Sequence, residues 1–251
     1  MTDITSPTGS RVALVTGASR GLGLATARKL AAHAVHVWLG VREVGSAQGA
    51  LAEIREAGGR ADAVALDVTR PADIAAAVRE IERACGCLDI LVNNAGVMLD
   101  GGWLGNTALS GDDETLRRTF ETNFFGTVAL TRACWPLLVA AGHANVVNVS
   151  SRMGSNTIHA DADGPLQGAK PFAYDASKAA LNAFTTHLAE VGRGVAVQVN
   201  SAHPGWVRTA LGTEHASLSI DEGVETIVQL ALLAPGSRTG RFEHLGEALP
   251  W

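Results

Sequence analysis

Short apolar runs alternate along the chain with longer segments whose apolar residues recur three and four positions apart. Residues 12–16 predict a strand, and residues 22–32, which follow a glycine-rich turn, predict an amphipathic helix. The further predicted strands are 35–39, 63–66, 88–93, 146–149 and 195–201, and the further predicted helices are 47–57, 72–84, about 113–141 and 176–191. Strands that alternate with helices in this way are typical of βαβ units.

The predicted strands are nearly all apolar, whereas a strand with one wet face would alternate apolar and polar residues. Such strands are expected where helices cover both faces of a parallel sheet. No repeat of fixed period and no linker-like change of composition divides the chain. We therefore predict a single α/β domain over residues 1–251, a Rossmann-type doubly wound parallel sheet of about seven strands with helices on both faces. Residues 1–10 are expected to be a flexible tail, and ligands are expected at the carboxyl ends of the strands.

Composition narrows the class of protein. A net charge of -5 offers no electrostatic reason to bind nucleic acid or an anionic membrane. No apolar run approaches the roughly 18 residues of a spanning helix, and the polar first ten residues predict no secretory signal. Three cysteines, Cys85, Cys87 and Cys134, are too few and odd in number for a disulfide framework, which favours free thiols. We expect a soluble cytoplasmic protein with a small-molecule partner.

The first predicted strand runs directly into a glycine loop, TGASRGLG, at residues 16–23, which opens the first helix. Glycines let the backbone turn sharply and approach a pyrophosphate, and the helix N-terminus supplies N–H groups for that anion. The spacing is G-x-x-x-G-x-G, which differs from the commoner G-x-G-x-x-G. An ordinary strand-to-helix turn remains the alternative, but the position at the first strand of a βαβ unit favours dinucleotide binding.

The end of the second predicted strand bears on the choice of cofactor. Arg42 stands just past this strand, and Arg20 lies in the glycine loop. Two guanidinium groups suit the 2′-phosphate of NADP, whereas an acidic residue at this place would hold the ribose hydroxyl of NAD. Glu43 lies near the acidic position, but it can equally occupy the first turn of the next helix, where acids are favoured. The pair of arginines favours NADP(H).

Six further segments resemble the short-chain dehydrogenase/reductase family, and the resemblance covers essentially the whole chain. The segments are LDV at 66–68, NNAG at 93–96, TNFFG at 122–126, VNVSS at 147–151, YDASK at 174–178 and HPGWVRT at 203–209. The resemblance implies a catalytic set of Asn123, Ser151, Tyr174 and Lys178. It also implies that Val41 stands where NAD-dependent members carry an acid, and that Arg42 stands where NADP-dependent members carry a base. The PGWVRT loop and the ending Leu249-Pro250-Trp251 are most similar to the carbonyl reductase branch.

The same resemblance implies a set of cofactor contacts. They are Gly17, Ser19, Arg20, Gly21, Leu22, Gly23, Arg42, Asp67, Val68, Asn94, Ala95, Gly96, Tyr174, Lys178, Pro204, Gly205, Val207 and Thr209. Ser151, Trp103 and Trp206 are the candidate substrate contacts, and no metal is required. The resemblance allows a homo-oligomer, dimer or tetramer, or a monomer.

The predicted chemistry centres on Tyr174, the only tyrosine of the chain. A phenol with an ordinary pKa of about 10 is a poor proton donor or acceptor at neutral pH unless a cation stabilises the phenolate. Lys178 lies four residues further on, on the same face of a helix, and would supply that charge. Ser151 would bond the substrate oxygen, and the resemblance gives Asn123 a water that links Lys178 to solvent. Taken singly, each residue has an ordinary alternative: a surface pair, a helix cap or a turn.

The interval between Ser151 and Tyr174 is 23 residues, longer than in the shorter family members. We expect this insertion, residues 152–173, to border the substrate site and to affect the surface that family oligomers use. His159, Asp161 and Asp163 within it suggest a metal site, but a solvated loop is the simpler interpretation. Segments 97–105 and 206–218, with Trp103, Phe172 and Trp206 among the apolar candidates, predict a pocket for a hydrophobic ketone or aldehyde.

Three functions fit these residues. The leading hypothesis is an NADPH-dependent carbonyl reductase, reversible as an alcohol dehydrogenase. A 3-oxoacyl reductase of lipid synthesis would share the catalytic set, although the insertion and the PGWVRT loop favour the first hypothesis. A non-catalytic NADP-binding sensor on the same fold is the third, and it would have no need of an acid/base set. Fold does not determine substrate, so the choice among enzymes rests on analogy.

Overall fold

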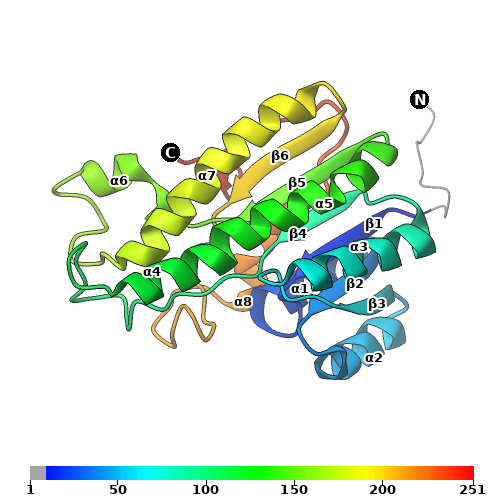
Figure 1. Ribbon diagram of the computed structural model, residues 1–251, viewed down its shortest axis with the longest axis horizontal. Helices are drawn as coiled ribbons and strands as arrows, with labels where there is room; N and C mark the ends of the chain where they lie inside the picture. Colours follow the sequence, from blue (N-terminus) through cyan, green and yellow to red (C-terminus); the bar gives the residue numbers. More distant parts are fainter. Residues whose placement is uncertain (1–9) are drawn as a thin grey trace.

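The computed structural model describes residues 10–251, so nearly all of the expected N-terminal tail, residues 1–9, lies outside the described residues. Within the described range, eight strands form one sheet in the order β3-β2-β1-β4-β5-β6-β7-β8 (Figure 1). The strands are β1 Val12–Thr16, β2 His36–Val41, β3 Arg60–Ala65, β4 Ile90–Asn93, β5 Ala144–Val149, β6 Val197–Ala202, β7 Phe242–His244 and β8 Glu247–Ala248. Strands β1 to β7 are parallel and β8 is antiparallel to β7. The predicted sheet is confirmed, with one short antiparallel strand added at its edge.

Helices cover both faces of this sheet. They are α1 Gly21–Ala32, α2 Gln48–Glu56, α3 Pro71–Cys85, α4 Asp113–Phe120, α5 Thr127–Ala140, α6 Asn156–Ala160, α7 Phe172–Arg193, α8 Ile220–Gly223 and α9 Glu225–Ala231. Buried residues of α1, α2 and α9 form one core on one face, and those of α3, α5 and α7 form a second core on the other. Figure 1 shows α3, α4, α5 and α7 in front of the strands.

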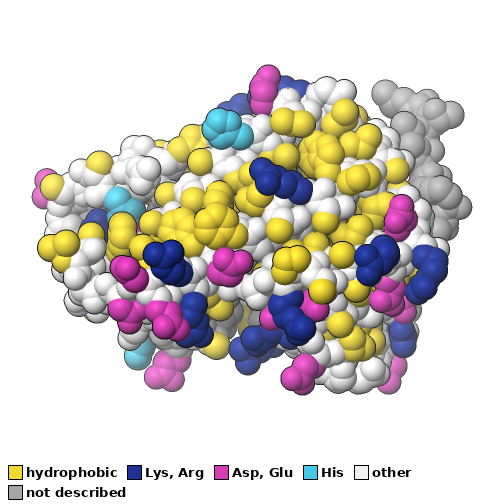
Figure 2. All heavy atoms as spheres, in the orientation of Figure 1, with side chains coloured by type: hydrophobic (Ala, Val, Ile, Leu, Met, Phe, Trp, Pro, Cys, Tyr) yellow, Lys and Arg dark blue, Asp and Glu magenta, His cyan; other side chains and the backbone are white. Residues whose placement is uncertain are grey.

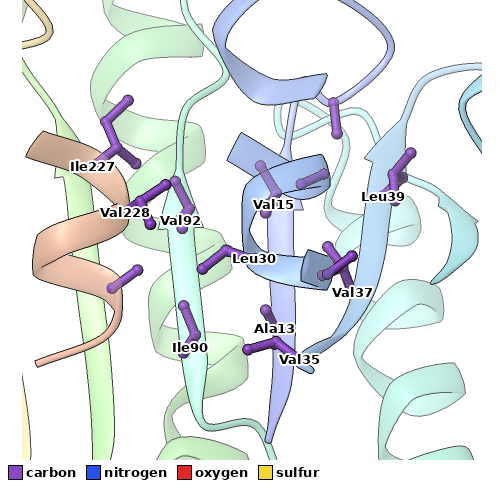
Figure 3. Packing of buried hydrophobic residues seen from close by; sticks show 14 of the residues in the cluster. Ala13, Val15, Leu30, Val35, Val37, Leu39, Ile90, Val92, Ile227 and Val228 are labelled. Carbon is purple, nitrogen blue, oxygen red and sulfur yellow. The ribbon is translucent and has the colours of Figure 1, made fainter. Parts of the chain in front are cut away.

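The continuous apolar strands follow from this layered arrangement. Side chains of a strand point alternately to its two faces. Ala13 and Val15 of β1 therefore join the core beneath α1 and α9, while Val12 and Leu14 join the opposite core. Figure 3 shows the first pair facing Leu30 of α1. Strand β1 thus buries apolar surface on both sides, at about 1.5–3 kcal/mol for each large side chain.

Four differences from the sequence prediction bear on function. The predicted helix at 113–141 consists of α4, a π-helical segment η2 at Glu121–Gly126, and α5. Helix α7 begins at Phe172 rather than near residue 176, so Tyr174 lies in its first turn. The insertion contains a short 3-10 turn, η3 at Arg152–Gly154, followed by α6. The elements after β6, from α8 to β8, were not predicted.

The surface adds two observations. Figure 2 shows hydrophobic side chains gathered over the region of α4, α5 and α7, where Phe125 is 52% exposed. Among residues 10–251 no helix has both the length and the apolarity to cross a membrane. The three cysteines are buried, and none of them forms a disulfide within the described residues.

Candidate active site

A cleft of about 1580 Å³ opens at the carboxyl ends of the strands. It is the position expected for the ligand of a doubly wound sheet. Segments 16–23, 40–42, 66–69 and 93–96 line one part, which we call the cofactor half. Segments 97–104, 151–169 and 203–218 contribute to the other part, which we call the substrate half. Every predicted cofactor and substrate residue lines this one cleft, whereas Asn123 stands buried behind its wall.

The glycine loop forms the floor of the cofactor half. Gly17 and Gly21 have φ angles of +63° and +57°, a backbone region that favours glycine. A Cβ on Gly23 would lie 2.4 Å from the carbonyl oxygen of Gly17, so no larger residue fits there without a backbone shift. Helix α1 begins at Gly21 and its N-cap residue, Arg20, makes no side-chain capping bond. The first amides of α1 are therefore available to an anion such as a pyrophosphate.

The NNAG segment is fixed against this loop by the last residue of β1. Thr16 Oγ1 accepts hydrogen bonds from the amides of Asn94 and Ala95, both at 2.9 Å. Asn94 Nδ2 donates in return to the carbonyl oxygen of Thr16 at 2.8 Å. These bonds join the ends of β1 and β4 into one rigid edge of the cofactor half.

Charged residues lie at the far end of the cofactor half. Arg20 and Arg42 are exposed and line the cleft, whereas Glu43 is exposed but does not line it. Asp67 is fixed by the amide and hydroxyl of Thr69 at 2.9 and 2.7 Å. Partial burial tends to raise the pKa of Asp67, but the hydrogen bonds from Thr69 and the charge of Arg42 hold it below its ordinary value. Both arginines thus line the cleft where the sequence predicts a phosphate, and Glu43 does not.

Tyr174, Ser151 and Lys178 meet where the two halves join. Ser151 follows β5 directly, and its Oγ accepts a hydrogen bond from the amide of Met153 at 3.2 Å. Lys178 lies one helical turn after Tyr174, with its Nζ 5.6 Å from the centre of the phenol ring. Burial raises the pKa of Tyr174 well above its ordinary value, a hydrogen bond with Ser151 opposes this rise, and the charge of Asp175 adds to it. The phenol is therefore a neutral proton donor at neutral pH.

Lys178 is buried with the phenol. Its Nζ donates to the carbonyl oxygen of Val149 at 2.8 Å, and burial lowers the pKa of Lys178 to about 8. Gly96 lies beside it, since a Cβ on Gly96 would be in ordinary contact with the same Nζ at 3.5 Å. An ammonium held in low dielectric beside the phenol favours loss of the phenolic proton.

Asn123 lies in the π-helical segment and joins three parts of the wall. Its Oδ1 accepts from the amide of Val97 and its Nδ2 donates to the carbonyl of Val97, both at 2.8 Å. Nδ2 also donates to Ser177 Oγ on α7 at 2.9 Å. The side chain is therefore occupied in holding segment 97–105 against α7. Ser150, the other candidate serine, also lines the cleft, but its hydroxyl donates to Asn182 Oδ1 at 2.7 Å.

Two tryptophans belong to the wall of the substrate half. Trp103 meets the ring of Tyr174 edge-on at 5.7 Å, and its Nε1 donates to the carbonyl of Leu211 at 3.1 Å. Trp206 is 49% exposed and donates to the carbonyl of Gly212. Phe172, a third candidate, lies at the start of α7, is exposed and does not line the cleft.

The insertion covers the catalytic tyrosine candidate. Met153 and Leu166 are buried with Tyr174 in a small cluster that Trp103 and Leu211 extend. His159 contacts Lys170 and Asp175 rather than Asp161 or Asp163, and residues 10–251 hold no group of three metal-ligating side chains. The insertion therefore borders the site as an apolar cover.

Sequence reasoning missed several residues of the site. Asp100 accepts hydrogen bonds from the amides of Ala173 and Tyr174 at 2.8 and 3.2 Å and thereby caps α7 from 73 residues upstream. Arg152 and His203 line the substrate half and bond each other. The Asp-Gly-Gly sequence at 100–102 was a turn signal, but nothing local showed which helix the aspartate would cap.

Comparison with known proteins identifies the family that has this fold and cleft. A profile described as short chain dehydrogenase matches residues 11–218. The chain belongs to the short-chain dehydrogenase family. Short-chain dehydrogenase/reductase 1 of Saponaria officinalis is 31% identical over 96% of each chain. The 3-oxoacyl-(acyl-carrier-protein) reductase FabG of Escherichia coli is 30% identical, over 95% of this chain and 88% of that one.

A solved structure, an NADPH-bound carbonyl reductase from chicken fatty liver, superposes with a TM-score of 0.84 at 28% identity. It covers 96% of this chain and 99% of that one. Because the match spans the whole sheet, this short-chain dehydrogenase has the fold and cleft of an oxidoreductase that acts on carbonyl and alcohol groups.

Proposed function

We propose that this short-chain dehydrogenase is an NADPH-dependent carbonyl reductase of apolar ketones or aldehydes, reversible as an alcohol dehydrogenase. The observation that carries the proposal is the meeting of Tyr174, Ser151 and Lys178 under the apolar cover, at the inner end of a cleft with two arginines at its outer end. Three buried cysteines without a disulfide among residues 10–251 support a reducing compartment such as the cytoplasm.

The cofactor half fits NADP(H). The α1 amides would hold the pyrophosphate, and Arg20 and Arg42 would hold the 2′-phosphate through charge-assisted bonds. Val41 is buried and apolar at the end of β2, so it offers the ribose of NAD no carboxylate. When bound, the reduced nicotinamide supplies the hydride.

The protein's own residues would supply the proton and hold the substrate. The hydroxyls of Tyr174 and Ser151 donate to the carbonyl oxygen, and the phenolic proton passes to that oxygen as negative charge develops on it. Lys178, whose pKa of about 8 leaves it mostly protonated at neutral pH, stabilises the phenolate that remains. Water that reaches Lys178 beside Asn123 would return the proton to Tyr174.

A panel of aldehydes and ketones tests this proposal through NADPH oxidation. Tyr174→Phe should lower kcat at least about 1000-fold while leaving the Kd of NADPH within a few-fold, because only the transferable proton is lost. Ser151→Ala should lose about 100-fold, whereas Ser150→Ala, the matched control that faces Asn182, should retain most activity. Substantial turnover by the phenylalanine variant would refute the assignment.

A 3-oxoacyl reductase is the second candidate, because FabG of Escherichia coli matches the chain over nearly its full length. Acetoacetyl-coenzyme A in the same panel distinguishes the two. A preference of tenfold or more for this thioester would favour the second candidate. NADPH binding without turnover of any carbonyl would instead favour a sensor.

A further inference from the structure

Among residues 10–251, Arg152 is the one arginine that lines the cleft from the segments of the substrate half, whereas Arg20, Arg42 and Arg118 line it elsewhere. It follows Ser151 immediately, on the turn after β5. Its Nε lies 3.1 Å from Nε2 of His203, at the end of β6, and its amide lies 3.4 Å from Nδ1 of the same ring. His244 of β7 packs against His203 with ring centres 5.0 Å apart and bonds its carbonyl oxygen at 2.9 Å. Three nitrogen-bearing side chains thus converge beside the proposed site of carbonyl reduction.

The positive charge of Arg152 has no carboxylate partner within ion-pair distance in residues 10–251. The buried acid nearest along the strands, Glu243 of β7, is paired with Arg238. Burial, followed by the charges of Arg152 and His244, lowers the pKa of His203 to about 3, so His203 is a neutral hydrogen-bond acceptor. His203 accepts a hydrogen bond from Nε–H of Arg152 but, being neutral, does not compensate the positive charge. Among residues 10–251, no acceptor is found for the two Nη groups of Arg152. An arginine has five N–H donors, so a pair of parallel donors is left for a ligand.

The surroundings define what such a ligand must be. The rest of this wall is formed mainly by Leu99, Trp103, Met153, Leu166 and Leu211, so the body of the ligand is apolar. Ser151 and Arg152 are adjacent in the chain and both line the cleft, so one ligand can meet both side chains. A planar guanidinium fork matches a carboxylate through two parallel hydrogen bonds.

We propose that Arg152 is a specificity-determining residue that binds the carboxylate of an apolar keto acid. The inference rests on the proposed carbonyl reduction and names its substrate class. Ser151 and Tyr174 take the carbonyl oxygen, and Arg152 takes the carboxylate. His203 fixes the plane of the guanidinium.

A matched pair of substrates tests the proposal. The probes are 2-oxo-4-phenylbutanoate and its methyl ester, which share the apolar body and the carbonyl and differ in charge. The ratio of kcat/KM for acid over ester should fall about 10- to 100-fold in Arg152→Met, because a charge-assisted pair is lost. The ester alone should change less than about threefold. Arg152→Lys should retain part of the preference as a point charge.

Arg208→Met is the control for a lost positive charge. Arg208 belongs to segment 203–218 but does not itself line the cleft. Its Nη1 donates hydrogen bonds to the carbonyl oxygens of Ala216 and Ser217. In Arg208→Met the ratio of kcat/KM for acid over ester should stay at the wild-type value. Equal losses for acid and ester in Arg152→Met would overturn the proposal, since Arg152 would then act only through His203. A weakened Kd of NADPH in that variant would also overturn it, because the anion would be a cofactor phosphate.

A binding measurement separates this inference from the proposed function. Trp103 and Trp206 line the substrate half, so their fluorescence should report binding of both probes to the NADP⁺ complex. Tight binding of the acid that depends on Arg152, without turnover, would keep the carboxylate site and refute the reductase. Equal binding of acid and ester by the wild-type protein would refute the carboxylate site.

Discussion

The cofactor half of the cleft rests on strand ends, whereas the substrate half rests on three long segments between elements. In the first, Thr16 joins the ends of β1 and β4 through buried bonds, and Gly23 packs directly against Gly17. In the second, Leu104 is 73% exposed and is tied to the insertion by an isolated bridge to Ala169. The comparison teaches that one part of the site is fixed by the fold, while the other is free to vary with the substrate.

The largest effect is expected from Gly23→Ala, which breaks the rigid half. The added Cβ would lie 2.4 Å from the Gly17 carbonyl oxygen, so the phosphate loop must move and lose several donors. We expect the Kd of NADPH to rise about 100-fold or more by calorimetry, since each lost bond to a charged group costs about 1.5–3 kcal/mol. Gly49→Ala on α2, where a Cβ meets nothing within 4 Å, is the matched control and should bind NADPH normally. Normal binding by the Gly23 variant would show that this half is not rigid.

Arg42→Asp sharpens the comparison inside the cofactor half. Loss of one charge-assisted contact should raise the Kd of NADPH about 30-fold and that of NADH less than about threefold. Glu43→Gln is the neighbouring control and should leave both values unchanged, because Glu43 does not line the cleft. An equal loss for both cofactors would remove Arg42 from recognition of the 2′-phosphate.

Asp100→Ala tests the contact that holds the first turn of α7, and with it Tyr174, where the two halves meet. Both carboxylate oxygens of Asp100 accept amide hydrogens from the first turn of α7, and the N-cap residue Pro171 makes no side-chain capping bond there. Losing this cap should let Tyr174 shift, with kcat about tenfold lower and the Kd of NADPH unchanged. Asp100→Asn keeps an acceptor and should recover part of the activity.

Asp112 provides the control, because its side chain caps α4 by accepting from the amide of Thr115. Asp112→Ala should cost stability similar to that lost by Asp100→Ala, about 1 kcal/mol, without the loss of kcat. If both variants lose activity in proportion to stability, Asp100 caps a helix and does not position Tyr174.

The same contrast explains how much the sequence could predict. The cofactor half was predictable because its signals are local: a glycine loop after an apolar strand, and an arginine just past the next strand. The segments and the two tryptophans that line the substrate half were also predicted, but its fixing contacts were not, because the capping of α7 by Asp100 and the contact of Arg152 with His203 join residues 73 and 51 positions apart. Strand β7 has three residues and β8 has two, too few for a periodic pattern to show. These strands depend on tertiary pairing at the edge of the sheet.

The smallest expected effect is a pH-dependent change in the free energy of unfolding that comes from His203 of the substrate half. The pKa of His203, in the substrate half, is lowered to about 3 by burial and by the charges of Arg152 and His244. Below about pH 6.5, His203 is protonated in the unfolded chain but stays neutral in the folded protein. This residue therefore lowers the free energy of unfolding as pH falls from about 6.5 towards 3. Between pH 7.5 and 5.5 the loss should be about 1 kcal/mol.

His203→Gln keeps an acceptor for Arg152 but cannot titrate. The stability of the wild type minus that of this variant, from urea unfolding at both pH values, should therefore decrease by about 1 kcal/mol on acidification. Subtracting the variant removes the contributions of other groups, including Asp175, whose pKa burial raises to about 8 and which acts in the opposite sense. A constant difference for His203→Gln would mean that His203 binds a proton in the folded protein, and that the charge of Arg152 is compensated in the substrate half.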